Sequence, residues 1–156
     1  YAGHLLVGTA DRIDVDDEGH AVVLDYKASV SPEHELAVRE EGRLGKVQTL
    51  IYAQVARRML GLNPVGALYV CYGKRCAVTG AYDATVLESP HLPSMRHDKC
   101  EFAPRDGESF ADLLDRTEEA IARGVERMLS GDVRPDPSSP HACTWCPVLS
   151  CTERRA

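Results

Sequence analysis

The chain has 156 residues, 44% of them hydrophobic and 27% charged, which is enough for one globular domain with a buried core. Its formal net charge of −6 lacks the basic excess that is typical of a free-standing nucleic-acid-binding domain. No apolar run is long enough to cross a membrane and no signal-peptide pattern opens the chain, so we predict a cytoplasmic protein. Because a strand-like pattern follows Tyr1 almost at once, we interpret the sequence as a fragment of a longer protein.

The first half of the sequence predicts a β-hairpin followed by a long helix. Residues 4–15 and 21–27 have the composition of strands, and the intervening DDEGH, residues 16–20, predicts the turn between them. Residues 36–60 carry apolar side chains at helical spacing, and Gly61 is placed to end that helix.

The second half predicts two short strands, a long loop and a second helix. Residues 65–72 form a short apolar run, and residues 76–82 predict a further strand. Residues 87–106 have no periodicity and predict a loop. Ser109 is a typical N-cap for a helix that extends to about Ser130. The apolar stripe of this helix consists of Phe110, Leu113, Leu114, Thr117, Ile121, Val125 and Met128.

This order of elements predicts an α/β (α+β) fold, in which helices flank a small mixed β-sheet. We expect a single domain over residues 1–156, with residues 132–156 forming a Cys-rich C-terminal arm.

The second predicted strand ends in an aspartate and a lysine, in the sequence VVLDYK. Asp25 and Lys27 are two residues apart, so both side chains point to one face of the strand while Tyr26 points to the other. If the turn lies at residues 16–19, Asp11 comes close to Asp25. Paired carboxylates favour Mg²⁺ or Mn²⁺, and a neighbouring lysine can stabilise the charge that develops during phosphodiester hydrolysis. The alternative is a surface ion pair between Asp25 and Lys27.

Other polar residues accompany this pattern. Asp14 is a further candidate carboxylate, but it is three residues from the first aspartate and faces the other way on a regular strand. Gln48 and Tyr52 are four residues apart and share one face of the predicted helix, of which they could also be no more than the polar edge. Arg57 and Arg58 either contact phosphate or form a solvated helix face.

The order GTAD, LDYK, QTLIY and a C-terminal C-x2-C-x4-C resembles the PD-(D/E)XK nuclease superfamily. Within it, the match is to the RecB/AddB-like branch, which includes nuclease domains of bacterial helicase–nuclease complexes. The resemblance extends from Gly8 to Cys151 and depends on four elements in the right order. It implies a restriction-endonuclease-like core, DNA as substrate, a role in repair and recombination, and a helicase domain or subunit as partner.

The resemblance also implies roles for individual residues. Asp11, Asp25 and the backbone carbonyl of Tyr26 would hold the Mg²⁺ or Mn²⁺ ion, and Lys27 would be the catalytic lysine.

Two residues would match the Q-x-x-x-Y motif that lies beside the active site and the DNA strand in this family, namely Gln48 and Tyr52. Gly8 would allow a close backbone approach just before the first aspartate. Family members usually carry an upstream helix with a further His or Glu near the metal. The sequence begins after the expected position of that helix, which leaves open whether the isolated fragment is active.

Three of the six cysteines cluster near the C-terminus, at Cys143, Cys146 and Cys151. A C-x2-C turn lets two thiolates reach one metal ion. The resemblance implies a structural [4Fe–4S] cluster, completed in the longer parent by a cysteine that would precede Tyr1. One alternative is three ordinary thiols. The other is a zinc site with a fourth ligand from among His141, Cys71, Cys76 and Cys100.

We therefore expect a Mg²⁺- or Mn²⁺-dependent, exonuclease-like deoxyribonuclease that acts on DNA ends or single strands. A catalytically inactive DNA-binding or scaffolding module of a helicase–nuclease complex is the alternative, favoured by the acidic net charge and the missing upstream helix. Retention of the motif residues favours the enzyme. A zinc-stabilised interaction domain would leave those residues unexplained.

Overall fold

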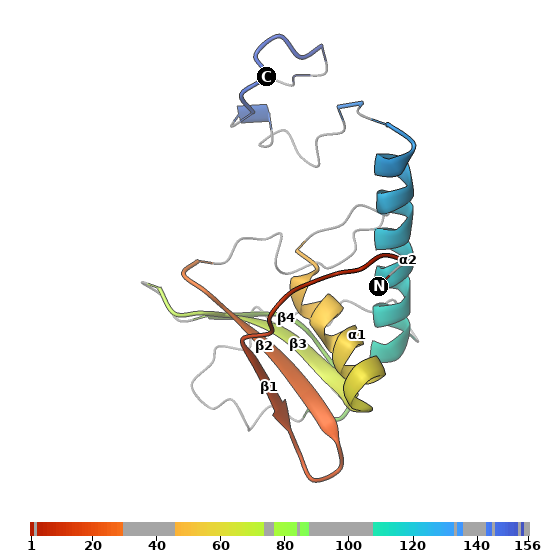
Figure 1. The fold of residues 1–156 in the computed structure, drawn as a ribbon. Helices are drawn as coiled ribbons and strands as arrows, with labels where there is room; N and C mark the ends of the chain where they lie inside the picture. Colours follow the sequence, from red (N-terminus) through yellow and green to blue (C-terminus); the bar gives the residue numbers. More distant parts are fainter. Residues whose placement is uncertain are drawn as a thin grey trace. The chain divides into compact units, whose positions relative to one another are not determined.

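The computed structural model describes residues 1, 3–29, 46–73, 77–83, 85–87, 108–132, 134–135, 143–144, 146–152 and 154 (Figure 1). Its elements in chain order are β1 (Arg12–Val15), β2 (His20–Lys27), α1 (Gln48–Leu60), β3 (Asn63–Cys71), β4 (Ala77–Tyr82) and α2 (Phe110–Leu129). The chain divides into two compact units, Tyr1–Ala122 and Arg123–Ala156, and the first contains the whole sheet. No helix in the described part of the chain has the length and apolar character needed to cross a membrane.

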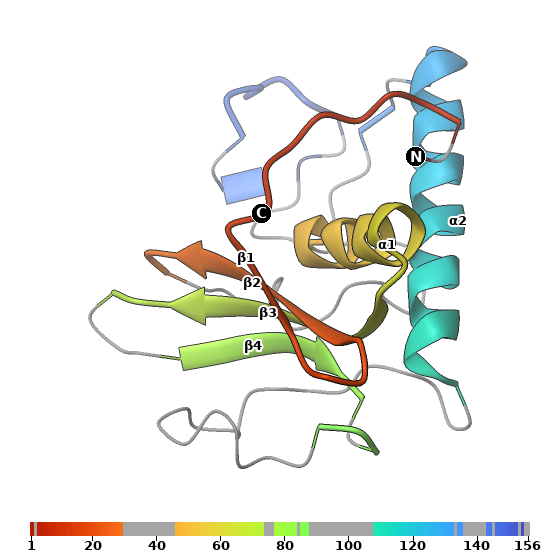
Figure 2. The ribbon, with the colours of Figure 1, turned by 60° about the horizontal axis from the view of Figure 1, so that its bottom comes forward.

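The four strands form one mixed sheet in the order β1-β2-β3-β4 (Figure 2). β1 and β2 are antiparallel, β2 and β3 are parallel, and β3 and β4 are antiparallel. A parallel pair needs a crossover connection, and α1 lies in the connection between β2 and β3. The predicted α/β (α+β) class, with a small mixed sheet and flanking helices, is confirmed.

The predicted hairpin forms, but its first strand is shorter than the sequence suggested. Gly19 adopts a positive φ of 82° in the turn, where Asp16 Oδ1 accepts hydrogen bonds from the backbone of Glu18 and His20. The prediction of a strand from residue 4 was wrong, because pairing with β2 begins only at Arg12. The side chain of Asp11 accepts a hydrogen bond from the backbone N–H of Tyr26, which removes the donor that a longer ladder would use.

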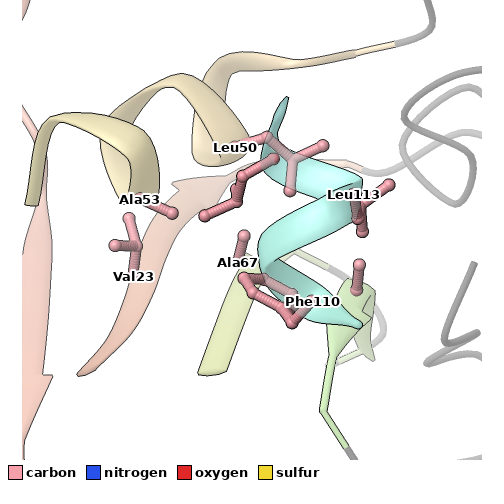
Figure 3. Close-up of a cluster of buried hydrophobic side chains, with 8 residues drawn as sticks. Val23, Leu50, Ala53, Ala67, Phe110 and Leu113 are labelled. Atoms are coloured by element: carbon pink, nitrogen blue, oxygen red, sulfur yellow. The ribbon is translucent and has the colours of Figure 1, made fainter. Parts of the chain in front are cut away.

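Both helices pack on one face of the sheet around a common core (Figure 3). Small residues of the sheet let the helices approach closely, and larger residues of the helices fill the space between them. This cluster consists of Val23, Ala67 and Ala81 from the sheet, Leu50 and Ala53 from α1, and Phe110, Leu113 and Leu114 from α2. The opposite face buries a second cluster that contains Leu24, Leu68, Val70 and Val78.

The start of α2 follows the prediction closely. The Ser109 hydroxyl accepts a hydrogen bond from the Asp112 N–H (3.1 Å), while the Asp112 carboxylate accepts from the Ser109 N–H (2.9 Å) and hydroxyl (2.7 Å). This reciprocal pair is a capping box closed by an aspartate. The predicted apolar stripe is buried only as far as Thr117; Ile121 and Val125 are half-buried, and Met128 at its end is 73% exposed.

The end of α1 also agrees with the prediction. Gly61 ends the helix in the left-handed conformation, with φ 65°. The described helix begins at Gln48, and residues 36–45 of the predicted helix lie outside the described residues. The predicted loop from residue 88 onward also lies outside them.

Candidate active site

The end of β2 places Asp25 and Lys27 on the face of the sheet that α1 covers. Alternate residues of β2 face the same side, and Val23 of that set packs against α1. Asp25 is buried, with 2% of its surface exposed, while Tyr26 between the two is 40% exposed. Burial of a carboxylate at this depth is costly without a counter-charge, and the sequence supplies one two residues later.

Lys27 and Asp25 form a close ion pair. Lys27 Nζ lies 2.5 Å from Asp25 Oδ2, and the close carboxylate raises the pKa of Lys27 above its usual value. Apart from this contact with Lys27, the buried Oδ2 has no hydrogen-bond donor among the described residues. Asp25 therefore presents a buried oxygen with an ionic neighbour and unused acceptor capacity.

Asp11 reaches the same place from the segment before β1. Its Oδ2 accepts a hydrogen bond from the Tyr26 N–H (2.9 Å), and its charge adds a smaller contribution to the raised pKa of Lys27. The pairing of Arg12 with Leu24 brings the preceding residue beside the end of β2. The exposed Asp14 instead accepts two hydrogen bonds from Arg12, at 2.6 and 2.8 Å.

The first turn of α1 completes the cluster through Gln48 and Tyr52. Lys27 Nζ donates a hydrogen bond to Gln48 Oε1 (3.1 Å), and Gln48 Nε2 donates to the Tyr52 hydroxyl (3.2 Å). The i, i+4 spacing places both side chains on one helix face, as the sequence predicted. The lysine is thus held between a buried carboxylate of the sheet and an amide of the helix.

Gly8 lies against Tyr52 rather than open space. A Cβ atom at Gly8 would lie 3.1 Å from the Tyr52 hydroxyl oxygen and 3.2 Å from its ring, so a larger residue would displace the tyrosine. The segment before β1 therefore packs over the first turns of α1. Leu5 and Val7 in this segment are 93% and 87% exposed.

A pocket of about 340 Å³ opens beside Lys27. Its walls come from the segment before β1, the ends of β2 and β3, and the start of α1. The lining residues are Leu6, Val7, Gly8, Lys27, Lys46, Val47, Gln48, Ile51, Tyr52 and Tyr69. Sequence reasoning missed Leu6, Val7, Ile51 and Tyr69 because they are ordinary apolar or aromatic residues that only the fold brings to the site.

Arg57 and Arg58 have partners on α2. Arg57 pairs with Asp115, and Arg58 pairs with Glu118, whose second oxygen accepts at 2.8 Å. The arginines therefore link the two helices, a role that the sequence analysis did not foresee; a contact with phosphate stays a prediction.

The carboxylates fit a hard divalent cation. Nowhere in the described ranges do three or more His, Cys, Asp or Glu side chains group to hold a metal ion. Asp11 nevertheless accepts the N–H of Tyr26, the residue after Asp25, and the buried Oδ2 of Asp25 has no hydrogen-bond donor among the described residues besides its contact with Lys27. Oxygen donors of this type suit Mg²⁺ or Mn²⁺.

The three C-terminal cysteines lie in the unit Arg123–Ala156. Cys143 is buried and Cys146 and Cys151 are half-buried free thiols, but the described residues of the unit Arg123–Ala156 contain no triplet positioned for a metal. Arg154 donates hydrogen bonds to the carbonyls of Cys146 and Val148, both at 3.3 Å.

Of the alternative zinc ligands, only Cys71 lies within the described part of the chain. It is buried at the end of β3, and its thiol donates to the Ala28 carbonyl at 3.4 Å. Cys76, Cys100 and His141 fall outside the described residues.

Comparison of the sequence with known proteins gives one match, to a protein family. The family described as the PD-(D/E)XK nuclease superfamily matches residues 2–151, which include the whole sheet, both helices and the three C-terminal cysteines. No curated protein and no solved structure matched the chain significantly. The mixed four-stranded sheet with two helices agrees with the restriction-endonuclease-like fold of that family. Because the match spans nearly all of its length, the chain belongs to the PD-(D/E)XK nuclease superfamily.

Proposed function

We propose that this chain is a Mg²⁺- or Mn²⁺-dependent deoxyribonuclease that hydrolyses phosphodiester bonds at the end of β2. The observation that carries the proposal is the buried Asp25 carboxylate, whose Oδ2 contacts the Lys27 ammonium group and otherwise has no hydrogen-bond donor among the described residues. A carboxylate buried to this degree usually accepts several hydrogen bonds or binds a metal ion. Members of the superfamily are generally nucleases that use these two cations.

The metal ligands in this proposal are Asp11, Asp25 and the backbone carbonyl of Tyr26. A divalent ion bound there would neutralise developing charge on the phosphate and lower the pKa of a bound water. Asp25 contributes a fixed, desolvated charge, and the hydrogen bond from Tyr26 N–H to Asp11 holds the second carboxylate beside it.

Lys27 would act on the substrate side of the carboxylates. Its raised pKa keeps the ammonium charged throughout the neutral range, and Gln48 holds the ammonium through a hydrogen bond. A fixed cation beside the scissile phosphate stabilises negative charge in the transition state without reorganising. Tyr52 supports this arrangement by accepting a hydrogen bond from Gln48.

The pocket beside Lys27 supports an unpaired strand as substrate. It combines apolar and aromatic walls with the lysines of positions 27 and 46, which is the chemistry needed to hold a base and its phosphates. A base that enters it must leave its duplex, so single strands or frayed ends fit better than an intact duplex.

Digestion of end-labelled single-stranded and double-stranded DNA by the chain, with Mn²⁺ or with EDTA, tests this function. We expect cleavage that requires the metal and that falls at least about 100-fold in Asp25→Asn. Asp17→Asn, in the exposed turn between β1 and β2, is the matched control and should cut like the wild type. Metal-independent cleavage, or full activity of Asp25→Asn, would show that the site is assigned wrongly.

We also propose the finer assignment to the RecB/AddB-like branch, with a role in DNA repair and recombination beside a helicase domain or subunit. Its support is the order of the Asp, Asp-x-Lys, Gln/Tyr and Cys motifs in the sequence. Co-purification of the full-length protein with a DNA-dependent ATPase activity is the expected result, and a full-length protein without one would exclude the helicase.

For the C-terminal cysteines we propose structural [4Fe–4S] ligation in the full-length protein. The described thiols do not form a metal-holding triplet by themselves, and the proposed reaction uses none of them. Iron and acid-labile sulfide in the anaerobically purified full-length protein, reduced by Cys146→Ser, would support the cluster. An iron-free, colourless and fully folded protein would exclude it.

A further inference from the structure

The N-terminus of α1 lacks a cap of its own. The residue at the N-cap position is Val47, which makes no side-chain hydrogen bond to the helix, and the first turn has no acidic residue. The first backbone N–H groups of a helix have no partner within it, and a valine side chain cannot supply one. The helix nevertheless begins with Gln48, whose side chain holds Lys27.

A residue of the sheet supplies the missing cap. Tyr69 lies on β3 directly opposite Asp25 in the parallel register and is 1% exposed. Its hydroxyl accepts a hydrogen bond from the backbone N–H of Thr49 (3.4 Å) and donates one to the carbonyl of Lys46 (3.0 Å). Thr49 is the second residue of the helix, and its N–H is the one that an N-cap side chain commonly satisfies.

The same ring lies under the ammonium group of Lys27. Nζ is 5.9 Å from the centre of the Tyr69 ring, within the range of a cation–π contact. Tyr69 therefore acts on both partners of the Lys27–Gln48 hydrogen bond. Its ring contacts the Lys27 ammonium group directly. Its hydroxyl holds the backbone of Lys46 and Thr49, before and after Gln48.

We propose that Tyr69 is a positioning residue of this site: by capping α1 from β3, it fixes Gln48 and thereby the ammonium group of Lys27. This inference rests on the proposed function for its catalytic consequence, but its structural part does not. A tyrosine opposite Asp25 ties the helix to the strand pair that carries the carboxylate, so the sheet and the helix cannot shift relative to each other without breaking the cap.

Tyr69→Phe is the informative variant, because it removes the hydroxyl and keeps the ring over which Lys27 lies. We expect kcat on single-stranded DNA to fall by about threefold to thirtyfold, the effect of losing an N-cap interaction, with little change in KM. Tyr72→Phe is the matched control, since Tyr72 lies one residue beyond β3 and is 64% exposed.

A double-mutant cycle with Gln48→Ala separates positioning from general stabilisation. If Tyr69 acts through Gln48, Tyr69→Phe should lower kcat by less than twofold when Gln48 is already alanine. Equal effects in both backgrounds would overturn the proposal and leave Tyr69 as an ordinary core residue.

Hydrogen exchange and NMR of the Lys27 side chain supply a readout that does not depend on nuclease activity. In Tyr69→Phe we expect the Thr49 amide to exchange at least about tenfold faster and the Lys27 Nζ signal to shift, with the core of β3 still protected. An unchanged Thr49 amide and an unchanged Lys27 signal would refute the proposal. A changed lysine signal in a protein that cuts no DNA would retain the positioning role and reject the nuclease.

Discussion

The Lys27→Met substitution removes the cation that pairs with the buried Asp25 carboxylate and keeps a side chain of similar length. Asp25 is 2% exposed and the Lys27 side chain is 32% exposed, so the aspartate has far less access to water than its partner. Removal of one member of a buried pair costs about 3–5 kcal/mol of unfolding free energy. Because the lysine is partly open to solvent, we expect the lower end, about 3 kcal/mol.

Urea unfolding at neutral pH without divalent ions measures this cost. With a slope of about 2 kcal/mol/M, the midpoint of Lys27→Met should fall by roughly 1.5 M. Adding Asp25→Asn to that variant should recover about 2 kcal/mol, because the uncompensated buried charge is then gone. Lys46→Met, a change at an exposed lysine of the same pocket, should stay within about 0.5 kcal/mol of the wild type. A double variant no more stable than Lys27→Met would refute the reasoning.

Three further predictions follow from the site and the fold. Mn²⁺ at about 100 times its dissociation constant should stabilise the wild type by about 2.7 kcal/mol and Asp25→Asn much less; equal thermal shifts would exclude Asp25 as a ligand. An abasic site beside the scissile phosphate should slow cleavage of single-stranded DNA about fivefold or more. Equal cleavage rates on abasic and intact DNA would show that the pocket beside Lys27 holds no base. Ser109→Ala should cost about 1 kcal/mol in urea unfolding at pH 7. Hydrogen bonds from Ser109 lower the pKa of Asp112, so the part of this cost that comes from the charged Asp112 carboxylate should be present above its ordinary pKa of 3.8 and disappear as the pH falls through the lower folded pKa. The part from the Ser109 hydroxyl, which accepts the Asp112 N–H, should remain, and a cost that does not change with pH would contradict this prediction.

The ion pair of Lys27 and Asp25 gives a further prediction, at alkaline pH. The carboxylate of Asp25 raises the pKa of Lys27, so the stability from this pair is complete below the ordinary lysine value of 10.5 and is lost as the pH rises through the higher folded value. Urea unfolding between pH 7 and 11 should therefore show a loss in the wild type that is absent in Lys27→Met. Parallel losses in both proteins would place the alkaline sensitivity elsewhere.

Local rules in the sequence predicted much of the fold. Period-two spacing placed Asp25 and Lys27 on one face of a strand, and the i, i+4 spacing placed Gln48 beside Tyr52. Ser109 predicted the start of α2 and Gly61 the end of α1, because caps depend on a few neighbouring residues. These features need no knowledge of distant parts of the chain.

Features that depend on distant contacts were not predictable in the same way. The first strand begins at Arg12 because the Asp11 side chain takes the Tyr26 N–H, a competition that composition does not reveal. The cap that Tyr69 supplies requires the parallel register of β2 and β3. The sequence left Arg57 as a phosphate contact or a solvated residue, and only the packing of α2 against α1 brings Asp115 beside it.

The most direct test of the nuclease assignment compares two aspartates three residues apart at the start of the hairpin. Asp11 accepts the Tyr26 N–H beside the buried carboxylate, whereas Asp14 pairs with Arg12 on the surface. In Mn²⁺-dependent digestion of end-labelled single-stranded DNA, we predict that Asp14→Asn cuts within about twofold of the wild type and that Asp11→Asn is slower by about 100-fold or more. Equal rates for the two variants, or no cleavage by the wild type, would contradict the account.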